Sequence, residues 1–264
     1  MRKEVQATDF NVAGKTVLIT GGARGLGRSY AETFVQHGCN VVLGDVNTEQ
    51  VKQTAAELQK LASGETQCIG VGLDVTQEAQ VEQVVADAVQ TFGSIDIVVN
   101  NAGIVDRVGI EEMTLDAWNR TIGVNLTGVF LVSKHAARAM IERKMRGSII
   151  NMASMSGIIV NVPMEQAAYN TSKAAVAMFT KSCAVEWAEY GIRVNAIAPG
   201  YMKTDMTGLD FEPGGKYYSL LDMIPMRRLG LPQELNGLAL FLASEASSYV
   251  TGAVLSVDGG YTLI

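Results

Sequence analysis

Residues 16–27 read TVLITGGARGLG, an apolar run followed at once by a loop that holds four glycines. The apolar run predicts a buried strand, and a helical pattern begins near Arg28. A glycine-rich turn between a strand and a helix lets the backbone approach a pyrophosphate, because free N–H groups and the positive end of the helix dipole face the phosphate charge. The chain has 27 glycines, so the spacing also fits an ordinary tight turn. Its position favours a nucleotide site that includes Gly21, Arg24, Gly25, Leu26 and Gly27.

Apolar runs of the same kind recur along the chain and alternate with longer amphipathic stretches. This alternation is typical of βαβ units that stack into a parallel sheet. Helices are predicted over 48–63, with Thr48 as the N-cap, and over 77–92. We therefore predict an α/β fold of the Rossmann type, a doubly wound, seven-stranded parallel sheet with helices on both faces. Its strands are predicted at 16–20, 40–45, 67–73, 95–100, 147–152, 192–198 and 253–257.

The length of 264 residues and the 48% hydrophobic content suit one large domain, 1–264, better than two small ones. Between about 200 and 231 the alternation stops, and glycine and proline accumulate. A long irregular insert in a compact domain is usually functional. We predict that this insert forms a lid over the substrate.

The overall composition argues against several kinds of partner. The 21 Lys and Arg against 27 Asp and Glu give a net charge of −6, which offers no basic surface for nucleic acid or an anionic membrane surface. No run approaches the roughly 20 apolar residues of a membrane span, and the amino terminus lacks the apolar region of a signal peptide, so a cytoplasmic protein is expected. The three separated cysteines are expected to be reduced packing residues. With two histidines, neither a His-rich metal site nor a Ser-His-Asp triad is expected.

The second predicted strand ends in Asp45, about 20 residues beyond the glycine loop. A carboxylate there accepts hydrogen bonds from the adenosine ribose hydroxyls and repels a 2′-phosphate, which favours NAD over NADP. Arg24 argues the other way, since a guanidinium in the glycine loop pairs well with a phosphate; we give Asp45 more weight. Further cofactor contacts are predicted at the ends of the third and fourth strands, at Asp74, Val75, Asn101, Ala102 and Gly103. The Asn-Ala-Gly sequence also fits a plain turn at the end of a strand.

Tyr169 and Lys173 stand four residues apart at the start of a helical pattern, so they share one helix face. A free phenol has a pKa of about 10 and is a poor base at neutral pH unless a nearby cation stabilises the phenolate. Lys173 can supply that cation, assisted by an oxidised nicotinamide. An exposed pair on a surface helix would show the same spacing, so the surrounding motifs have to decide.

Those motifs resemble the short-chain dehydrogenase/reductase family over nearly the whole chain. The resemblance comprises the TGGARGLG loop, NNAG after the fourth strand, Asn125 in GVNLTG, Ser154 after the fifth strand, Tyr169 with Lys173, and Pro199-Gly200 followed by Met202 and Thr204. It implies that the serine orients the substrate oxygen, that the tyrosine exchanges the proton and that the lysine also holds the nicotinamide ribose. It further implies that the asparagine holds a water and that the threonine contacts the carboxamide. The family thus implies catalytic residues Asn125, Ser154, Tyr169 and Lys173, with Pro199, Gly200, Met202, Thr204, Tyr169 and Lys173 added to the cofactor site.

Two serines compete for the catalytic role in NMASMSG. The family pattern S-x-x-G selects Ser154 with Gly157, although Ser154 lies 15 residues before Tyr169 where 13 is usual; Ser156 has the usual spacing. The longer loop is similar to that of polyol and sugar dehydrogenases of the galactitol and threitol kind. That likeness implies a polyol substrate, with contacts predicted at Ser154, Ser156, Asn161 and Tyr169.

Three other functions stay open. A 3-oxoacyl carrier-protein reductase or a gluconate 5-dehydrogenase-like reductase would share these motifs, whereas a nucleotide-sensing protein would keep the fold and lose the chemistry. The expected partners are NAD, a small alcohol or ketone and further copies of the chain. The apolar helical patterns at 128–140 and 174–188, together with the family resemblance, imply a homotetramer.

Overall fold

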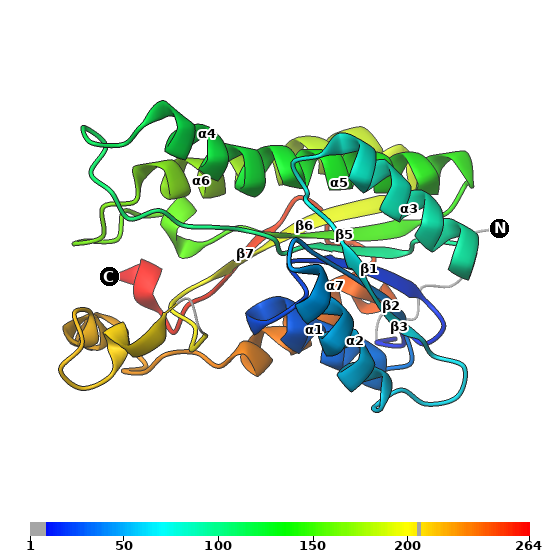
Figure 1. The fold of residues 1–264 in the computed structure, drawn as a ribbon, viewed down its shortest axis with the longest axis horizontal. Helices are drawn as coiled ribbons and strands as arrows, with labels where there is room; N and C mark the ends of the chain where they lie inside the picture. The colour runs from blue at the N-terminus through cyan, green and yellow to red at the C-terminus, as the bar shows by residue number, and fades with distance from the viewer. Residues whose placement is uncertain (1–8, 205–206) are drawn as a thin grey trace.

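A seven-stranded, fully parallel sheet lies between two layers of helices (Figure 1), in the order β3-β2-β1-β4-β5-β6-β7. The computed structural model describes residues 9–204 and 207–264, so residues 1–8 of the amino terminus discussed above lie outside the described part. All seven predicted strands are confirmed, three of them residue for residue. Their bounds are β1 Thr16–Thr20, β2 Asn40–Asp45, β3 Cys68–Gly72, β4 Ile97–Asn100, β5 Gly147–Met152, β6 Ile192–Pro199 and β7 Val254–Val257.

The helices divide between the two faces of the sheet as the doubly wound topology requires. Figure 1 shows α3, α4, α5 and α6 above the sheet and α1, α2 and α7 below it. The predicted single α/β domain of the Rossmann type is therefore confirmed. The helices are α1 Gly25–Gln36, α2 Thr48–Gln59, α3 Glu78–Phe92, α4 Leu115–Ile122, α5 Gly128–Glu142, α6 Ala167–Trp187 and α7 Asn236–Ala243.

Alternate side chains of each inner strand serve the two halves of the core. In β1, Val17 and Ile19 pack with the α1, α2 and α7 layer, whereas Leu18 packs with α3 and α5; all three are fully buried. This two-residue period, with apolar residues on both faces, is typical of a parallel strand covered on both sides. The apolar runs in the sequence therefore fix both the sheet and its two helical layers.

Some predicted helix boundaries are wrong. The first helix begins at Gly25 instead of near Arg28. The N-cap of α2 is Asn47, whose side chain accepts a hydrogen bond from Gln50 N at 3.1 Å, so Thr48 is already the first helical residue. The same helix ends at Gln59 and does not reach 63, because the Gln59 side chain bonds Thr66 O and Cys68 N and turns the chain toward β3.

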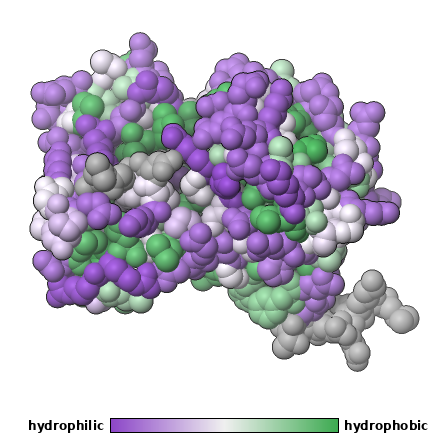
Figure 2. Space-filling model, turned by 60° about the horizontal axis from the view of Figure 1, so that its bottom comes forward, coloured by the Kyte–Doolittle hydropathy of each residue, from purple (hydrophilic) through white to green (hydrophobic). Residues whose placement is uncertain are grey.

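In the sheet, β1 lies between β2 and β4, so the order of the strands reverses at β1. In sheets of this kind ligands bind at the carboxyl ends of the strands next to such a reversal. The segment 200–231 follows the carboxyl end of β6 and lies at the same end of the molecule, at the lower left of Figure 1. It holds the short 3₁₀ helices η4 Gly208–Phe211 and η5 Tyr218–Met223, and a bridge between Met202 and Gly230 closes its base. At this end Figure 2 shows hydrophobic side chains at the surface among hydrophilic ones.

Candidate active site

The glycine loop between β1 and α1 has a backbone that only glycine accommodates. Gly21 has φ 64°, and a side chain on Gly27 would collide with the carbonyl oxygen of Gly21. Gly25 has φ 57°, and a Cβ there would meet no atom within 4 Å. The loop is therefore closed on its inner side and open at Gly25, in front of the first turn of α1. These residues fit a dinucleotide, because a phosphate could approach the open backbone at a helix N-terminus.

Side chains from neighbouring strands hold this loop in place. Asn101 Nδ2 donates to the carbonyl oxygens of Thr20 and Gly21, each at 3.0 Å. Thr20 Oγ1 accepts from the N–H groups of Asn101 and Ala102, each at 3.1 Å. The structure thus uses the Asn101 side chain to fasten the loop. Of the two remaining loop residues, Arg24 is exposed at the N-cap of α1, and Leu26 packs against the core.

Asp45 lies beside the glycine loop at the carboxyl end of β2. Its Oδ2 accepts from Ala23 N at 3.1 Å and its Oδ1 accepts from Asn47 N at 3.0 Å. Asp74 follows β3 and its Oδ1 accepts from both the N–H and the hydroxyl of Thr76. Val75 is buried against α5, where it touches the position of Gly128. The backbone bonds fix the Asp45 carboxylate in one orientation while each oxygen keeps a second lone pair for another donor.

Helix α6 carries Tyr169 and Lys173 one turn apart, and the Lys173 ammonium lies 5.6 Å from the centre of the Tyr169 ring. Lys173 is buried, and its Nζ donates to Met152 O at the end of β5 at 2.7 Å. Ser154, two residues beyond β5, reaches the same place, since its hydroxyl hydrogen-bonds Tyr169. The three predicted catalytic side chains therefore converge from one strand end and one helix.

Burial changes the protonation of this group. It raises the pKa of Tyr169, while the Ser154 hydrogen bond and the charge of Arg107 lower it. Burial also lowers the pKa of Lys173 to about 8. A low-polarity environment disfavours the charged form of each residue. A phenolate at Tyr169 thus depends on the neighbouring hydroxyl and cations for stabilisation.

The two competing serines have different neighbours. Ser154 Oγ accepts from Ser156 N at 3.1 Å and caps the short 3₁₀ turn η2 Met155–Gly157. Ser156 Oγ accepts from Gln166 Nε2 at 3.2 Å and is buried. A Cβ on Gly157 would lie 2.6 Å from the backbone carbon of Lys173, so glycine lets this turn touch α6. The close approach explains why the S-x-x-G pattern begins at Ser154.

Asn125 lies in a π-helical turn, Gly123–Thr127, that joins α4 to α5. Its Oδ1 accepts from Ile104 N at 2.8 Å, and its Nδ2 donates to Ile104 O and to Ser172 Oγ. A Cβ on Gly103 would lie 3.4 Å from Asn125 Oδ1 and 3.5 Å from Lys173 Nζ, so the three residues adjoin one another. Asn125 thus ties the segment after β4 to α6 next to the buried lysine. The π turn itself has no signal that we recognised in the sequence.

The end of β6 brings the predicted Pro199, Gly200, Met202 and Thr204 to the same edge of the sheet. Pro199 is the last strand residue, and a Cβ on Gly200 would lie 2.6 Å from Asp258 Cα. Met202 is buried in the core cluster that also contains Ile19 and Leu235, and Thr204 N donates to Thr207 Oγ1 at 3.0 Å. These residues form the start of segment 200–231.

An aromatic cluster forms one wall of the site. It joins the Ser154 loop to the insert and consists of Met155, Met164, Tyr201, Phe211, Tyr217, Leu220, Ile224 and Tyr261. The predicted substrate contact Asn161 is fully buried here; its Nδ2 lies 3.4 Å from the Tyr201 hydroxyl, and its Oδ1 has no hydrogen-bond partner among the described residues.

Arg107 was missed in the sequence, because a single arginine after the fourth strand belongs to no motif. It bonds Asp210 in the insert at 3.3 Å, and its charge acts on both Tyr169 and Tyr201.

Within residues 9–204 and 207–264, none of the helices combines the length and the apolar content of a membrane span. No group of three or more His, Cys, Asp or Glu side chains there could hold a metal ion.

Comparison with known proteins agrees with this geometry. A family profile described as "Enoyl-(Acyl carrier protein) reductase" matches residues 21–262. The 2,5-dichloro-2,5-cyclohexadiene-1,4-diol dehydrogenase of Sphingobium indicum is 39% identical, over 96% of this chain and 98% of its own length. The galactitol 2-dehydrogenase (L-tagatose-forming) of Cereibacter sphaeroides is also 39% identical, over 97% and 98%.

Solved structures give the same result. A short-chain type dehydrogenase/reductase from Mycobacterium marinum has a TM-score of 0.91 and 40% identity, covering 97% of this chain and 98% of its own. A gluconate 5-dehydrogenase from Burkholderia cenocepacia, in complex with NADP and tartrate, has a TM-score of 0.90 and 36% identity, covering 98% and 99%. This chain therefore belongs to the short-chain dehydrogenase/reductase family of oxidoreductases.

Proposed function

We propose that this protein oxidises a secondary alcohol of a polyol or sugar alcohol to the ketone, and reduces the ketone in the reverse direction, with NAD. The observation that carries the proposal is the convergence of Ser154, Tyr169 and buried Lys173 next to the carboxyl end of β5. When bound, the nicotinamide cofactor supplies the acceptor for the hydride that leaves the alcohol carbon.

The four catalytic side chains have different tasks in the proposed reaction. The Ser154 hydroxyl orients the substrate oxygen, and Tyr169 as phenolate takes the hydroxyl proton while the carbonyl forms. Lys173 stabilises that phenolate by its charge and holds the nicotinamide ribose. Asn125 holds a water that links Lys173 to solvent, which agrees with its place beside Gly103 and Lys173.

The cofactor would lie along the carboxyl ends of the strands. The residues proposed to hold it are Gly21, Arg24, Gly25, Leu26, Gly27, Asp45, Asp74, Val75, Asn101, Ala102, Gly103, Tyr169, Lys173, Pro199, Gly200, Met202 and Thr204. NAD is proposed over NADP because the Asp45 carboxylate is held beside the loop by two backbone N–H groups. A 2′-phosphate there would meet a negative charge, whereas a ribose diol would donate to it. The relative from Burkholderia cenocepacia was solved with NADP, so the preference of this protein for NAD has to be measured.

Asp45→Ala tests the cofactor proposal. Hydrogen bonds to a charged group contribute roughly 1.5 to 3 kcal/mol, and tenfold in affinity corresponds to about 1.4 kcal/mol. We expect the wild type to prefer NAD by at least about tenfold in kcat/KM, and the variant to narrow that gap. Steady-state kinetics with both cofactors measure the ratio. Comparable use of NADP by the wild type, or an unchanged gap in the variant, would show that Asp45 is not the selector.

A polyol substrate is proposed from the resemblance to galactitol 2-dehydrogenase and from polar side chains in the wall of the site. Ser156 and Asn161 are buried there, and Asn161 Oδ1 has no partner among the described residues, which leaves an acceptor for a substrate hydroxyl. Segment 200–231 is proposed to act as the lid, since its aromatic residues complete that wall.

A panel of alditols and their ketoses, followed by absorbance of the reduced nicotinamide, tests the activity. Turnover of several members is the expected result. Cofactor binding without turnover of any alcohol or ketone would favour a nucleotide-sensing protein. Turnover confined to 3-oxoacyl thioesters would favour the acyl reductase.

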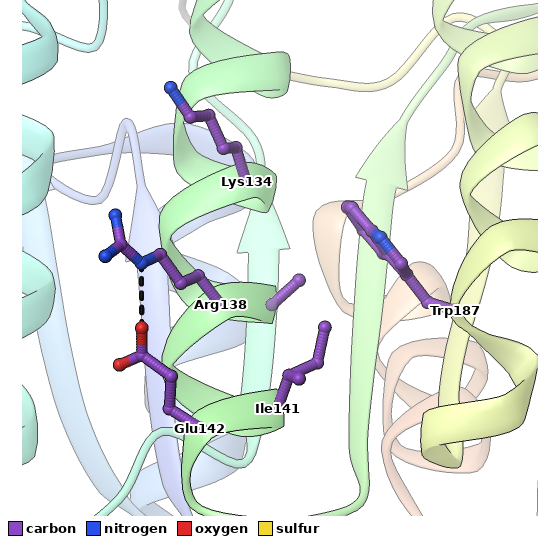
Figure 3. A pocket seen from close by; sticks show the side chains of 6 residues that line it. Lys134, Arg138, Ile141, Glu142 and Trp187 are labelled. Carbon is purple, nitrogen blue, oxygen red and sulfur yellow. Dashed lines mark hydrogen bonds and ion pairs between the residues drawn. The ribbon is translucent and has the colours of Figure 1, made fainter.

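We also propose a homotetramer that uses α5 and α6. A shallow groove between these helices is lined by Lys134, Ala137, Arg138, Ile141, Glu142 and Trp187. Figure 3 shows Trp187 of α6 across this groove from the side chains of α5, where Arg138 bonds Glu142 at 2.8 Å. None of the residues that line it belongs to the candidate active site, so a contact here would leave the site open.

A further inference from the structure

Gln166 joins the two ends of the loop that carries Ser154. It is the N-cap residue of α6, it is buried, and its side chain makes no capping bond to the helix. Its Nε2 instead donates to Ser156 Oγ at 3.2 Å, near the start of the loop, and to Asn170 Oδ1 at 3.1 Å, in the first turn of α6. A side-chain amide has two N–H donors, so this pair of bonds uses both. We call Ser156, Gln166 and Asn170 the amide clasp.

The clasp reaches the catalytic serine in one step. Ser156 N donates to Ser154 Oγ at 3.1 Å, and the Ser154 hydroxyl also hydrogen-bonds Tyr169. A hydroxyl has one proton and two lone pairs. With the Ser156 N–H on one lone pair, the proton and the second lone pair are left for Tyr169 and for a substrate oxygen. The position of Ser156 therefore decides where the Ser154 hydroxyl can point.

The middle of the loop is restrained less than its ends. Ile158, Val160 and Val162 are 48%, 73% and 65% exposed, so apolar burial holds this stretch weakly. The close packing of Gly157 on α6 sets how near the turn can come to the helix. A directional bond across the loop adds a restraint against movement away from the helix.

We propose that Gln166 is a positioning residue: its amide holds Ser156, and through Ser156 the hydroxyl of Ser154, where that hydroxyl reaches Tyr169 and the substrate oxygen. The inference rests on the proposed function, because it assigns Gln166 to the reaction of Ser154 and Tyr169. The clasp closes the longer loop, since Gln166 lies ten residues after Ser156.

A direct contact between Gln166 and the substrate is the competing role. Both N–H donors of its amide already have protein acceptors, so Gln166 would have to give up one of these bonds in order to donate to a substrate. The bonds therefore favour positioning. A bond from a substrate hydroxyl to Gln166 Oε1 would appear in KM with kcat unchanged, whereas a misplaced Ser154 lowers kcat.

Gln166→Met keeps the length of the side chain and removes the amide. With the alditol that the wild type oxidises best, we expect kcat to fall about tenfold or more, because misplacement by about 1 Å can cost about 10² in rate. KM and cofactor affinity should change by less than about threefold. The pH profile of kcat should move to higher pH. The Ser154 hydrogen bond lowers the pKa of Tyr169, so its loss raises the pH at which the phenolate forms.

Ser156→Ala tests the route of this effect. It keeps the backbone N–H that bonds Ser154 and removes the hydroxyl that bonds Gln166. Alone it should lower kcat and move the pH profile in the same direction, which keeps the inference testable if Gln166→Met does not fold. In the double variant kcat should lie within about twofold of the lower single variant. Gln166→Glu should recover part of kcat, because the Ser156 hydroxyl can rotate and donate to the carboxylate.

Gln59→Met is the matched control. The Gln59 side chain also makes two bonds, to Thr66 O and from Cys68 N, but it lies at the end of α2 and outside the candidate active site. The control should lower the melting temperature and leave kcat and its pH profile unchanged. Melting temperature and cofactor binding confirm that each variant is folded.

Three results would overturn the inference while the proposed function stands: an unchanged kcat and pH profile in Gln166→Met, a loss confined to KM, or losses in the two single variants that multiply in the double variant. A wild type that oxidises no alditol and reduces no ketose with either cofactor would instead remove the proposed function and this inference together.

Discussion

Lys173 and Tyr169 are held in a place where burial opposes the charge of both. Burial raises the pKa of the tyrosine and lowers that of the lysine to about 8. The fold offsets part of this cost for the ammonium with the carbonyl of Met152 at 2.7 Å. For the phenolate, the stabilising groups are the Ser154 hydroxyl and the nearby positive charge. The low local dielectric makes both residues costly to charge. For the same reason, charges at this place interact more strongly with their neighbours than they would in water.

Lys173→Met tests the cost of burying this ammonium. In the unfolded chain the pKa of lysine is near its ordinary value of 10.5, and in the folded protein it is about 8. Between these values the unfolded state binds more protons, so the free energy of unfolding rises with pH. Relative to Lys173→Met, the cofactor-free wild type should gain about 2 kcal/mol between pH 7 and pH 9.5. Denaturant unfolding across this range measures the difference, and parallel curves for the two proteins would contradict it.

Tyr169→Phe tests proton transfer. The change removes the phenolic oxygen alone, so cofactor affinity should stay nearly the same, while kcat should fall by about 10² to 10⁴. Tyr249→Phe, at a fully exposed tyrosine, is the control and should keep full activity. Single-turnover kinetics and cofactor titration separate the two effects. A variant that retains more than about one tenth of wild-type turnover would remove Tyr169 from the role.

At the scale of elements, close backbone approach is what brings the catalytic residues together. Gly157 lets the turn that carries Ser154 touch α6, and Gly27 lets α1 touch the end of β1. The contact at Gly157 joins a turn to a helix that lies beside it only in the folded protein, whereas the contact at Gly27 closes the loop between β1 and α1. The glycines therefore act on the site by setting the distance between its elements.

Gly157→Ala should separate the Ser154 turn from α6. The added Cβ would lie 2.6 Å from the backbone of Lys173, so one element must move. We expect a loss of about 1–3 kcal/mol in stability and a fall in kcat of about 10². Gly237→Ala in α7, where a Cβ meets no atom within 4 Å, is the matched control and should be neutral or stabilising. A normal kcat for Gly157→Ala would show that the contact does not position Ser154.

The sequence predicted the elements better than the contacts between them. The apolar runs predicted every strand, because a buried parallel strand has a local signature, and one-turn spacing predicted that Tyr169 and Lys173 share a helix face. Arg107 was missed because its neighbours Asp210 and Tyr217 are about a hundred residues away in the chain. The use of Asn101 as a fastener of the glycine loop was missed for the same reason. Such contacts depend on the tertiary fold and leave no local pattern.

At the scale of the whole molecule, α5 and α6 expose several large apolar side chains to solvent. Met178 and Val185 are 60% and 81% exposed and lie seven residues apart on one face of α6. Phe130 of α5 is 42% exposed and meets Phe179 edge-on, with ring centres 6.4 Å apart. These exposed apolar side chains lie on the same two helices that border the groove of Figure 3. We call them the apolar face of α5 and α6. A second copy of the chain is the partner that we propose for it.

Charge placed on this face should prevent assembly. In Met178→Glu/Val185→Glu two carboxylates would be buried in the proposed interface without partners, which costs several kcal/mol per charge and exceeds what a contact of ordinary size can offset. We expect sedimentation velocity at micromolar concentration to give a tetramer for the wild type and dimers or monomers for the variant. Leu61→Glu is the control, because Leu61 is 45% exposed beyond the end of α2 in the opposite helical layer, and it should remain a tetramer. A monomeric wild type would show that the apolar face is not an interface between copies, and a tetrameric double variant would move the interface to another surface.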